Sequence, residues 1–250
     1  MKALITGASS GIGKEIAKKL DKLGFELILV AKTEIKLLET KKELNNNVQT
    51  IVLDLSKEEN CYKLYEQVKK DNIDILINNA GFGIYGEFIN IDLSKELNML
   101  NTNIKTVHIL TKLFLQDFYK KNKGYILNTA STAAFFSGPL MSSYYATKSY
   151  ILHLTEGINE ELKQNKSKVY IGILCPGPVN TEFNKKAKIK FGVKAMEPEE
   201  VATYAIKKMF QRKTIIIPGF KNKILVIFGK LIPRNIMKKI NYKIQKRKEL

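Results

Sequence analysis

Short apolar segments alternate with amphipathic ones along most of this chain, and this alternation is the feature that most constrains its fold. Seven segments read as strands, most of them continuously apolar and rich in Ile, Val and Leu: residues 2–6, 25–31, 48–55, 73–78, 124–130, 168–174 and 214–218. Strands that are buried on both faces have this composition. Between them lie helical patterns with apolar residues on one face and lysines on the other, such as Ile12, Ile16, Leu20 and Leu23. The sequence therefore predicts an α/β fold with helices on both sides of one parallel sheet.

A glycine-rich turn joins the first predicted strand to the first predicted helix, in "TGASSGIGKEIAKKL" (residues 6–20). Gly7, Gly11 and Gly13 allow the backbone to turn tightly and to approach a pyrophosphate closely. The helix that follows would present free N–H groups and a partial positive charge to that phosphate. Ser9 and Ser10 can add hydroxyl donors. This position predicts a cradle for a dinucleotide, and a simple tight turn is the alternative.

The segment "SSYYATKSY" (residues 142–150) places two adjacent tyrosines about one helical turn before Lys148. On a helix both Tyr144 and Tyr145 can neighbour the lysine, so spacing alone does not choose between them. A phenol, with an ordinary pKa of about 10, keeps its proton at neutral pH and can protonate the alkoxide that hydride transfer leaves on a carbonyl. A neighbouring ammonium would lower that pKa and favour the reverse reaction. The alternative is a half-buried aromatic beside a lysine stem, without chemistry.

These features occur in the order found in the short-chain dehydrogenase/reductase family, which the sequence resembles. The glycine spacing is similar to the T-G-x-x-x-G-x-G of that family. It is followed by "NNAG" (78–81), "NTNIKT" (101–106), "NTASTAA" (128–134), Y-x-x-x-K (144–148) and "PGPVNT" (176–181). The matches span residues 6–181, about 70% of the chain. The resemblance implies a Rossmann-type doubly wound parallel sheet in a single domain, residues 1–250.

The resemblance also implies the residues of an active site. Y-x-x-x-K selects Tyr144 as general acid and base, and Ser131, 13 residues earlier, would bind the substrate oxygen. Lys148 would lower the pKa of Tyr144 and hold the nicotinamide ribose. Asn103 would hold a water in a proton relay, with Asn101 as a nearby competitor. The implied activity is the interconversion of a carbonyl and a secondary alcohol, and a catalytically silent dinucleotide-binding sensor or scaffold is the alternative.

The residues after the second predicted strand bear on the choice of cofactor. Ala31, Lys32 and Thr33 stand where an NAD-specific site has a carboxylate for the ribose 2′-hydroxyl, and a basic residue there accommodates the 2′-phosphate of NADP. By resemblance NADP(H) is preferred, and NAD(H) is also admitted because lysine lacks the fork of arginine. An ordinary surface lysine is the alternative for Lys32. The full set of cofactor contacts implied is Gly7, Ser9, Ser10, Gly11, Ile12, Gly13, Lys32, Asp54, Leu55, Asn79, Ala80, Gly81, Tyr144, Lys148, Pro176, Gly177, Val179 and Thr181.

Two segments lie outside these motifs. Residues 179–196 follow neither the helical nor the strand period and are predicted to form a substrate lid, with a plain surface loop as the alternative. Residues 219–250 form a basic extension, because residues 184–250 hold 19 Lys or Arg against four Asp or Glu in a chain of net charge +18. Lysine makes up 39 of the 42 basic residues, so composition bias alone is a competing explanation.

The end of this extension has the pattern of a basic amphipathic helix over residues 234–248, with Ile236, Met237, Ile240 and Ile244 on one face. Such a helix either packs on the protein or across a subunit interface, or makes a weak contact with an anionic membrane. No nucleic-acid-binding module is recognised, and we expect no nucleic acid partner.

The remaining expectations concern location and partners. No apolar run reaches the length of a membrane-spanning helix, the start of the chain reads as a strand, and Cys61 and Cys175 show neither metal spacing nor a disulfide framework. We expect a cytoplasmic protein, at most peripheral at a membrane, without a metal. Its partner is a small-molecule carbonyl or alcohol that the sequence does not identify. The resemblance implies a homodimer or homotetramer that pairs through residues 92–120 and 142–165.

Overall fold

A computed structural model describes residues 1–183 and 195–247 of the chain. Within these residues a seven-stranded sheet has the order β3-β2-β1-β4-β5-β6-β7, and every neighbouring pair of strands is parallel. The strands are β1 (Lys2–Thr6), β2 (Glu26–Ala31), β3 (Val48–Val52), β4 (Ile75–Asn78), β5 (Tyr125–Thr129), β6 (Tyr170–Leu174) and β7 (Ile215–Ile216). All seven predicted strands are confirmed, as is the Rossmann-type doubly wound sheet.

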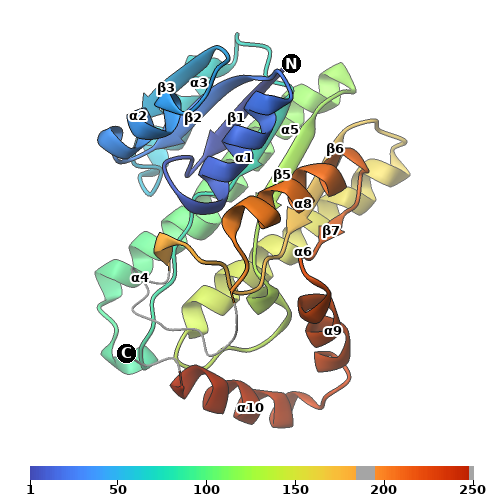
Figure 1. The fold of residues 1–250 in the computed structure, drawn as a ribbon. Coiled ribbons are helices and arrows are strands. Elements are labelled where there is room, and N and C mark those ends of the chain that lie inside the picture. Colours follow the sequence, from blue (N-terminus) through green and yellow to red (C-terminus); the bar gives the residue numbers. More distant parts are fainter. Residues whose placement is uncertain (184–194, 248–250) are drawn as a thin grey trace.

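Helices cover both faces of this sheet (Figure 1). They are α1 (Gly11–Lys22), α2 (Glu34–Lys42), α3 (Glu58–Val68), α4 (Leu93–Leu100), α5 (Thr106–Lys121), α6 (Ser142–Gln164), α8 (Pro198–Phe210), α9 (Phe220–Gly229) and α10 (Arg234–Lys246). Three short segments join them: the 3₁₀ turns η1 (Phe88–Asn90) and η3 (Thr132–Phe135) and the π-helical turn η2 (Asn101–Lys105).

Alternate residues of each strand serve the two faces, as the side-chain period of a strand requires. In β1, Ile5 belongs to the apolar layer that also holds Ile16 of α1 and Met209 of α8. Its neighbour Leu4 belongs to the opposite layer, with Phe114 of α5. Because both layers are apolar, the strands read as continuous apolar runs in the sequence.

The strand order reverses beside β1, which pairs with β2 on one side and β4 on the other. In open α/β sheets a ligand crevice lies at such a reversal, beyond the carboxyl ends of the strands. A buried polar ladder fixes the helices next to this crevice. Asn78 Nδ2 donates to Asn128 Oδ1 (2.9 Å) and to Thr111 Oγ1 (3.1 Å), and Asn128 Nδ2 donates to Thr155 Oγ1 (3.0 Å). These bonds tie α5 and α6 to strands β4 and β5.

Six of the seven strands are shorter than predicted, and β3 and β7 lose the most, three residues each. β3 ends at Val52 instead of residue 55, because the Asp54 carboxylate accepts hydrogen bonds from the backbone N–H (3.0 Å) and hydroxyl (2.8 Å) of Ser56 and closes a turn. β7 is confined to Ile215–Ile216 instead of residues 214–218. Pro218 has no N–H with which to continue a ladder.

The predicted lid over residues 179–196 falls mostly on residues 184–194, which lie outside the described part of the chain. On either side of them, Val179 and Met196 form a parallel bridge. After β7 the chain continues into α9 and α10, and α10 runs across the end of the molecule opposite the N-terminus (Figure 1). None of the described helices is both long and apolar enough to cross a bilayer.

Candidate active site

The glycine loop between β1 and α1 has the shape of a phosphate cradle. Gly7 and Gly11 have positive φ angles of 66° and 55°, which side-chain-bearing residues rarely adopt. At Gly13 a Cβ atom would lie 2.3 Å from the carbonyl oxygen of Gly7, so only glycine lets α1 approach β1 this closely. Ser10 is the N-cap of α1 but its side chain makes no capping bond. The first-turn N–H groups of α1 are therefore not taken by a side-chain cap, as the binding of a pyrophosphate requires.

The segment after β4 is fastened to this loop. Asn79 Nδ2 donates to the carbonyl oxygens of Thr6 (3.2 Å) and Gly7 (3.3 Å). In return the Thr6 hydroxyl accepts from the backbone N–H groups of Asn79 (3.0 Å) and Ala80 (3.1 Å). Asn79 and Ala80 thus brace the cradle from the neighbouring strand, and the side chain of Asn79 is occupied by this bracing.

The loop after β6 closes the other side of the cradle. A Cβ atom on Gly11 would lie 3.0 Å from Cγ2 of Thr181, so Thr181 lies against the glycine loop. Pro176 accepts hydrogen bonds at its carbonyl oxygen from the N–H of Thr132 (2.9 Å) and from Oγ of Ser131 (3.3 Å). The segment from Pro176 to Thr181 therefore connects the end of β5 to the phosphate cradle, which suits residues that hold a nicotinamide.

The two adjacent tyrosines of α6 have different surroundings. Tyr144 is buried and its hydroxyl is hydrogen-bonded to the side chain of Ser131. Tyr145 turns away toward α10, where its hydroxyl accepts a hydrogen bond from Nε2 of Gln245. Its ring occupies the space beside Gly138. The structure therefore brings Tyr144, and not Tyr145, to Ser131.

Lys148 lies on the same buried side of α6 as Tyr144. Its ammonium is 5.8 Å from the centroid of the Tyr144 ring and donates to the carbonyl oxygen of Thr129 (3.0 Å). Burial lowers the pKa of Lys148 to about 8. Burial also raises the pKa of Tyr144 above its ordinary value, and the hydrogen bond with Ser131 offsets only part of this. The pKa of Tyr144 is thus raised overall because desolvation of the phenol dominates, and the expectation that Lys148 lowers it stays a prediction. The phenol of Tyr144 therefore keeps its proton at neutral pH.

Asn103 lies in η2, a π-helical turn of the kind that often marks functional sites. Its amide is buried and fully engaged. Nδ2 donates to the Phe82 carbonyl oxygen (2.9 Å) and to Thr147 Oγ1 (3.1 Å), while Oδ1 accepts from the Phe82 N–H (3.1 Å). A Cβ atom on Gly81 would lie 3.0 Å from Asn103 Oδ1 and 3.3 Å from Lys148 Nζ. Asn103 and Lys148 therefore both lie against Gly81. Of the two competing asparagines, Asn103 is the one that the structure brings to Lys148.

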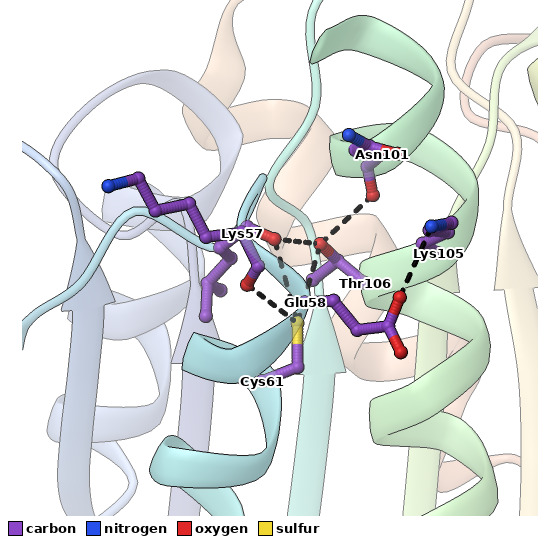
Figure 2. A network of polar contacts seen from close by, with 7 residues as sticks. Lys57, Glu58, Cys61, Asn101, Lys105 and Thr106 are labelled. Carbon is purple, nitrogen blue, oxygen red and sulfur yellow. Dashed lines mark hydrogen bonds and ion pairs between the residues drawn. The ribbon is translucent and has the colours of Figure 1, made fainter. Parts of the chain in front are cut away.

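The loop that carries Asp54 and Leu55 is linked to the same π-helical turn. In Figure 2, Thr106 donates to the carbonyl oxygens of Leu55 and Asn101, and the thiol of Cys61 contacts Thr106 Oγ1 at 3.7 Å. Burial raises the pKa of the Cys61 thiol, which keeps it a neutral packing group. The loop that carries Asp54 and Leu55 is in this way held at a fixed distance from the turn that carries Asn103.

Lys32 is exposed directly after β2, and its charge acts on Asp54 across the β2–β3 end of the sheet. For Asp54, burial raises the pKa, but hydrogen bonds from Ser56 and the charges of Lys32 and Lys57 lower it below its ordinary value overall. The side chain of Asp54 is thus engaged by Ser56. At the end of β2 itself, Ala31, Lys32 and Thr33 include no carboxylate, and Lys32 is the charged side chain among them.

Sequence reasoning missed three residues that shape the site. Thr6 could have been found, since a threonine ends an otherwise apolar strand directly before Gly7. Thr147 lies inside Y-x-x-x-K and joins Asn103 to the carbonyl oxygen of Tyr144, to which it donates (2.7 Å). Gln245 has no sequence signal, because it is one polar residue in a lysine-rich tail. It is buried nonetheless, and Tyr85 donates to its carbonyl oxygen (3.2 Å).

A doubly wound parallel sheet with a glycine cradle, and with a half-buried serine beside a buried tyrosine and a buried lysine at its carboxyl end, defines the class of dinucleotide-binding oxidoreductases. The family model described as short chain dehydrogenase matches residues 1–190. The chain belongs to the short-chain dehydrogenase/reductase family.

Two relatives and one solved structure show how similar the chain is to other proteins. An uncharacterized oxidoreductase of Staphylococcus saprophyticus is 30% identical over 216 residues, 84% of this chain and 91% of that protein. The NADP-dependent 3-hydroxy acid dehydrogenase of Schizosaccharomyces pombe is 32% identical over 231 residues, 86% of this chain and 88% of that protein. A short-chain dehydrogenase from Sphingobium yanoikuyae in complex with NADPH superposes with a TM-score of 0.82 at 28% identity, covering 91% of this chain and 92% of that one.

Proposed function

We propose that this protein is an NADP(H)-dependent oxidoreductase that interconverts a carbonyl and a secondary alcohol, with Tyr144 as general acid and base. The observation that carries the proposal is the grouping of the half-buried Ser131 with the buried Tyr144 and Lys148 beside the glycine cradle. The hydroxyl of Tyr144 is hydrogen-bonded to Ser131, and the centroid of its ring lies 5.8 Å from the ammonium of Lys148. A bound NADPH would supply the hydride.

The roles follow from the chemistry of an oxygen that gains negative charge. The phenolic O–H of Tyr144 donates its proton to that oxygen, which it can do at neutral pH because burial raises its pKa. Ser131 donates a hydrogen bond to the same oxygen and stabilises the developing charge. The ammonium of Lys148 stabilises the phenolate left behind and is the group placed to hold the nicotinamide ribose. Asn103, whose Oδ1 accepts one hydrogen bond and lies, like Lys148 Nζ, against Gly81, would position a water that returns the proton through the remaining acceptor position of Oδ1.

NADP(H) is the proposed cofactor, with NAD(H) as a weaker one. Lys32 gives the end of β2 a positive charge, and the carboxylate that binds a free 2′-hydroxyl is missing from Ala31–Thr33. The Schizosaccharomyces relative is named as NADP-dependent and the Sphingobium structure holds NADPH, which supports the same choice.

Titrating both cofactors into wild type, Lys32→Ala and Lys41→Ala tests this choice. Loss of one charged contact to the 2′-phosphate should weaken NADPH binding about tenfold and leave NADH binding unchanged. Lys41→Ala removes an exposed lysine of the same helix-and-strand unit and should change neither. Equal affinities of wild type for the two cofactors would contradict the preference.

A homodimer or homotetramer that pairs through α4, α5 and α6 is also proposed. These helices carry features that suit contact with a second copy. α4 exposes the apolar side chains of Leu93 and Leu97. His108 Nδ1 of α5 lies 2.8 Å from the Tyr150 hydroxyl of α6. Sedimentation equilibrium of wild type and Leu97→Glu tests it, with a monomeric wild type as the contrary result.

The experiment that tests the activity is an absorbance assay of NADPH oxidation against a panel of ketones and aldehydes. Turnover of at least one chemical class is expected. A silent sensor would instead show a raised melting temperature with NADPH and no oxidation of it on any substrate, in either direction.

A further inference from the structure

The C-terminal helices present their apolar side chains outward. Over α9 and its C-terminal flank, apolar residues recur at the spacing i, i+4, i+7, i+8 and i+11, which is normally the core-facing stripe of a helix. Here the stripe is exposed, with Phe228 61% and Leu231 75% accessible. α10 carries a second exposed stripe, in which Ile236, Ile240 and Ile244 follow one another at intervals of about one helical turn. Together the two helices expose Phe220, Ile224, Leu225, Ile227, Phe228, Leu231, Ile236, Ile240 and Ile244, which we call the C-terminal apolar surface.

A different face of α10 attaches it to the body of the protein. Met237, Asn241 and Gln245 recur every four residues and are turned inward. Asn241 Nδ2 donates to the Ser137 carbonyl oxygen (2.8 Å), and Gln245 is bonded to Tyr145 and Tyr85. The sequence grouping of Met237 with the isoleucines is therefore wrong, since Met237 lies on the attached face. The isoleucine stripe is free in this chain although the helix is held in place.

The charge around the C-terminal apolar surface has one sign. Residues 219–247 contain nine basic residues and no acidic one. They are Lys221, Lys223, Lys230, Arg234, Lys238, Lys239, Lys243, Lys246 and Arg247. A second copy docked through this surface would bring two sets of nine positive charges together, and nucleic acid would not bury the apolar stripes. An anionic bilayer complements both properties, because acyl chains take the apolar groups while lysine heads reach the phosphates.

The helix that carries part of this surface also contacts the surroundings of the candidate active site. Gln245, on the attached face of α10, contacts Tyr145, the neighbour of Tyr144, and Tyr85. Around Tyr144 the packed side chains are themselves apolar or aromatic: Phe82, Ile84, Tyr85, Met99, Met141, Tyr145 and Phe183. The phenol thus lies among apolar and aromatic side chains, two of which, Tyr85 and Tyr145, contact α10, and these surroundings suit an apolar substrate.

We propose that the C-terminal apolar surface docks on an anionic phospholipid bilayer, and that the active site takes an apolar carbonyl or alcohol dissolved in that bilayer. The second half rests on the proposed function, whereas the docking does not. The proposed partner of the surface is thus a lipid bilayer, and the proposed substrate comes from that bilayer.

Sedimentation of the full chain with vesicles of phosphatidylglycerol and phosphatidylcholine tests the docking. Leu225→Ser should bind about tenfold more weakly, since one leucine no longer enters the acyl region. Its matched control is Leu23→Ser, at the opposite end of the strands and equally exposed (52% against 55%). Lys238→Gln with Lys239→Gln should weaken binding about 30-fold at low salt and little at high salt, because the field of the lipid phosphates is screened. Lys41→Gln with Lys42→Gln removes the same charge from α2 and should leave binding unchanged.

Three outcomes would overturn the docking. Equal binding to pure phosphatidylcholine vesicles would exclude the role of the lysines. Self-association that Leu225→Ser abolishes, without vesicle binding, would make the surface an interface between copies of this chain. Salt-dependent retention on DNA that is insensitive to Leu225→Ser, again without vesicle binding, would make it a nucleic-acid surface.

Turnover of two ketones tests the substrate class. Wild type and Leu225→Ser should reduce a short water-soluble ketone equally, whereas a long-chain ketone dissolved in anionic vesicles should be reduced about tenfold more slowly by the variant. Equal rates on the vesicle-borne ketone would overturn the substrate half. If wild type binds vesicles but oxidises NADPH with neither ketone nor with the wider panel, the proposed function fails while the docking stands.

Discussion

Lys148 is a positive charge placed inside the protein, and burial lowers the pKa of its ammonium to about 8. The same burial raises the pKa of Tyr144, so the phenol keeps its proton over the range in which the lysine titrates. Above its pKa the lysine is neutral and, in the proposed mechanism, would no longer stabilise the phenolate that forms when Tyr144 gives up its proton. Under that proposal the charge state of Lys148 sets the pH range in which Tyr144 can act as proton donor.

The rate of NADPH-dependent reduction, as kcat/KM, should therefore be steady below the pKa of Lys148 and fall as pH rises through about 8. The sign follows because Lys148 carries its proton below that pH and loses it above, while Tyr144 remains protonated on both sides. A pH–rate profile on any accepted ketone measures this. A profile that is still flat at about pH 9.5, or that rises from about pH 7, would show that Lys148 does not titrate as described.

At the scale of the element, the π-helical turn η2 is the piece that gathers the site. Its extra residue turns Asn103 inward, where the amide joins the segment after β4 to α6 through Phe82 and Thr147. Thr106 ties the same turn to the adenine side through Leu55. One irregular turn thereby sets the distance between two ends of the crevice.

Asn103→Ala should lower the free energy of unfolding by about 1–3 kcal/mol, because it leaves the partly buried N–H and carbonyl of Phe82 without this partner. Asn101→Ala is the matched control: its backbone oxygen, and not its side chain, accepts the bond from Thr106, so stability should change little. Urea denaturation of the two variants compares them. Similar losses for both, or none for either, would contradict the role given to the turn.

The glycine cradle makes a second prediction at this scale. Gly13→Ala would place a Cβ atom 2.3 Å from Gly7 O, so α1 must move away from β1. We expect a loss of stability of about 1–3 kcal/mol from this overpacking and a loss of NADPH binding of tenfold or more, on the order of one phosphate contact. Gly157→Ala is the opposite case, because nothing lies within 4 Å of its Cβ position inside α6. It should raise stability by about 0.5–1 kcal/mol. Thermal unfolding and cofactor titration test both, and a neutral Gly13→Ala would contradict the close approach.

For the whole molecule, much of the arrangement could be predicted from the sequence. The strands were predictable because apolar layers on both faces make them continuous runs, and Gly7, Gly11 and Gly13 because only glycine suits the turn. Tyr144 was selected by its motif alone; spacing left Tyr145 equal until packing against Gly138 and Gln245 separated them. The raised pKa of Tyr144 and the π-turn were not predictable, because burial and a one-residue change of helical period depend on tertiary packing. Neither was the inward face of α10, since polar contacts decide it.

The candidate site and the C-terminal helices lie at the same end of the sheet. The amino ends of the strands carry no part of the candidate site, whereas the carboxyl ends carry the cradle, the buried phenol and, beside them, α9 and α10 (Figure 1). The excess of positive charge lies on the same C-terminal part of the chain. A molecule arranged in this way faces its substrate and its proposed lipid partner with one side.

The central claim is that Tyr144 gives the proton, and the comparison of Tyr144→Phe with Tyr145→Phe tests it most directly. Tyr144→Phe removes the donor and little packing, so kcat should fall about 10²–10⁴-fold while the dissociation constant of NADPH stays within about twofold. Tyr145→Phe loses only its bond to Gln245 and should keep most of the turnover. An active Tyr144→Phe together with an inactive Tyr145→Phe would contradict the account.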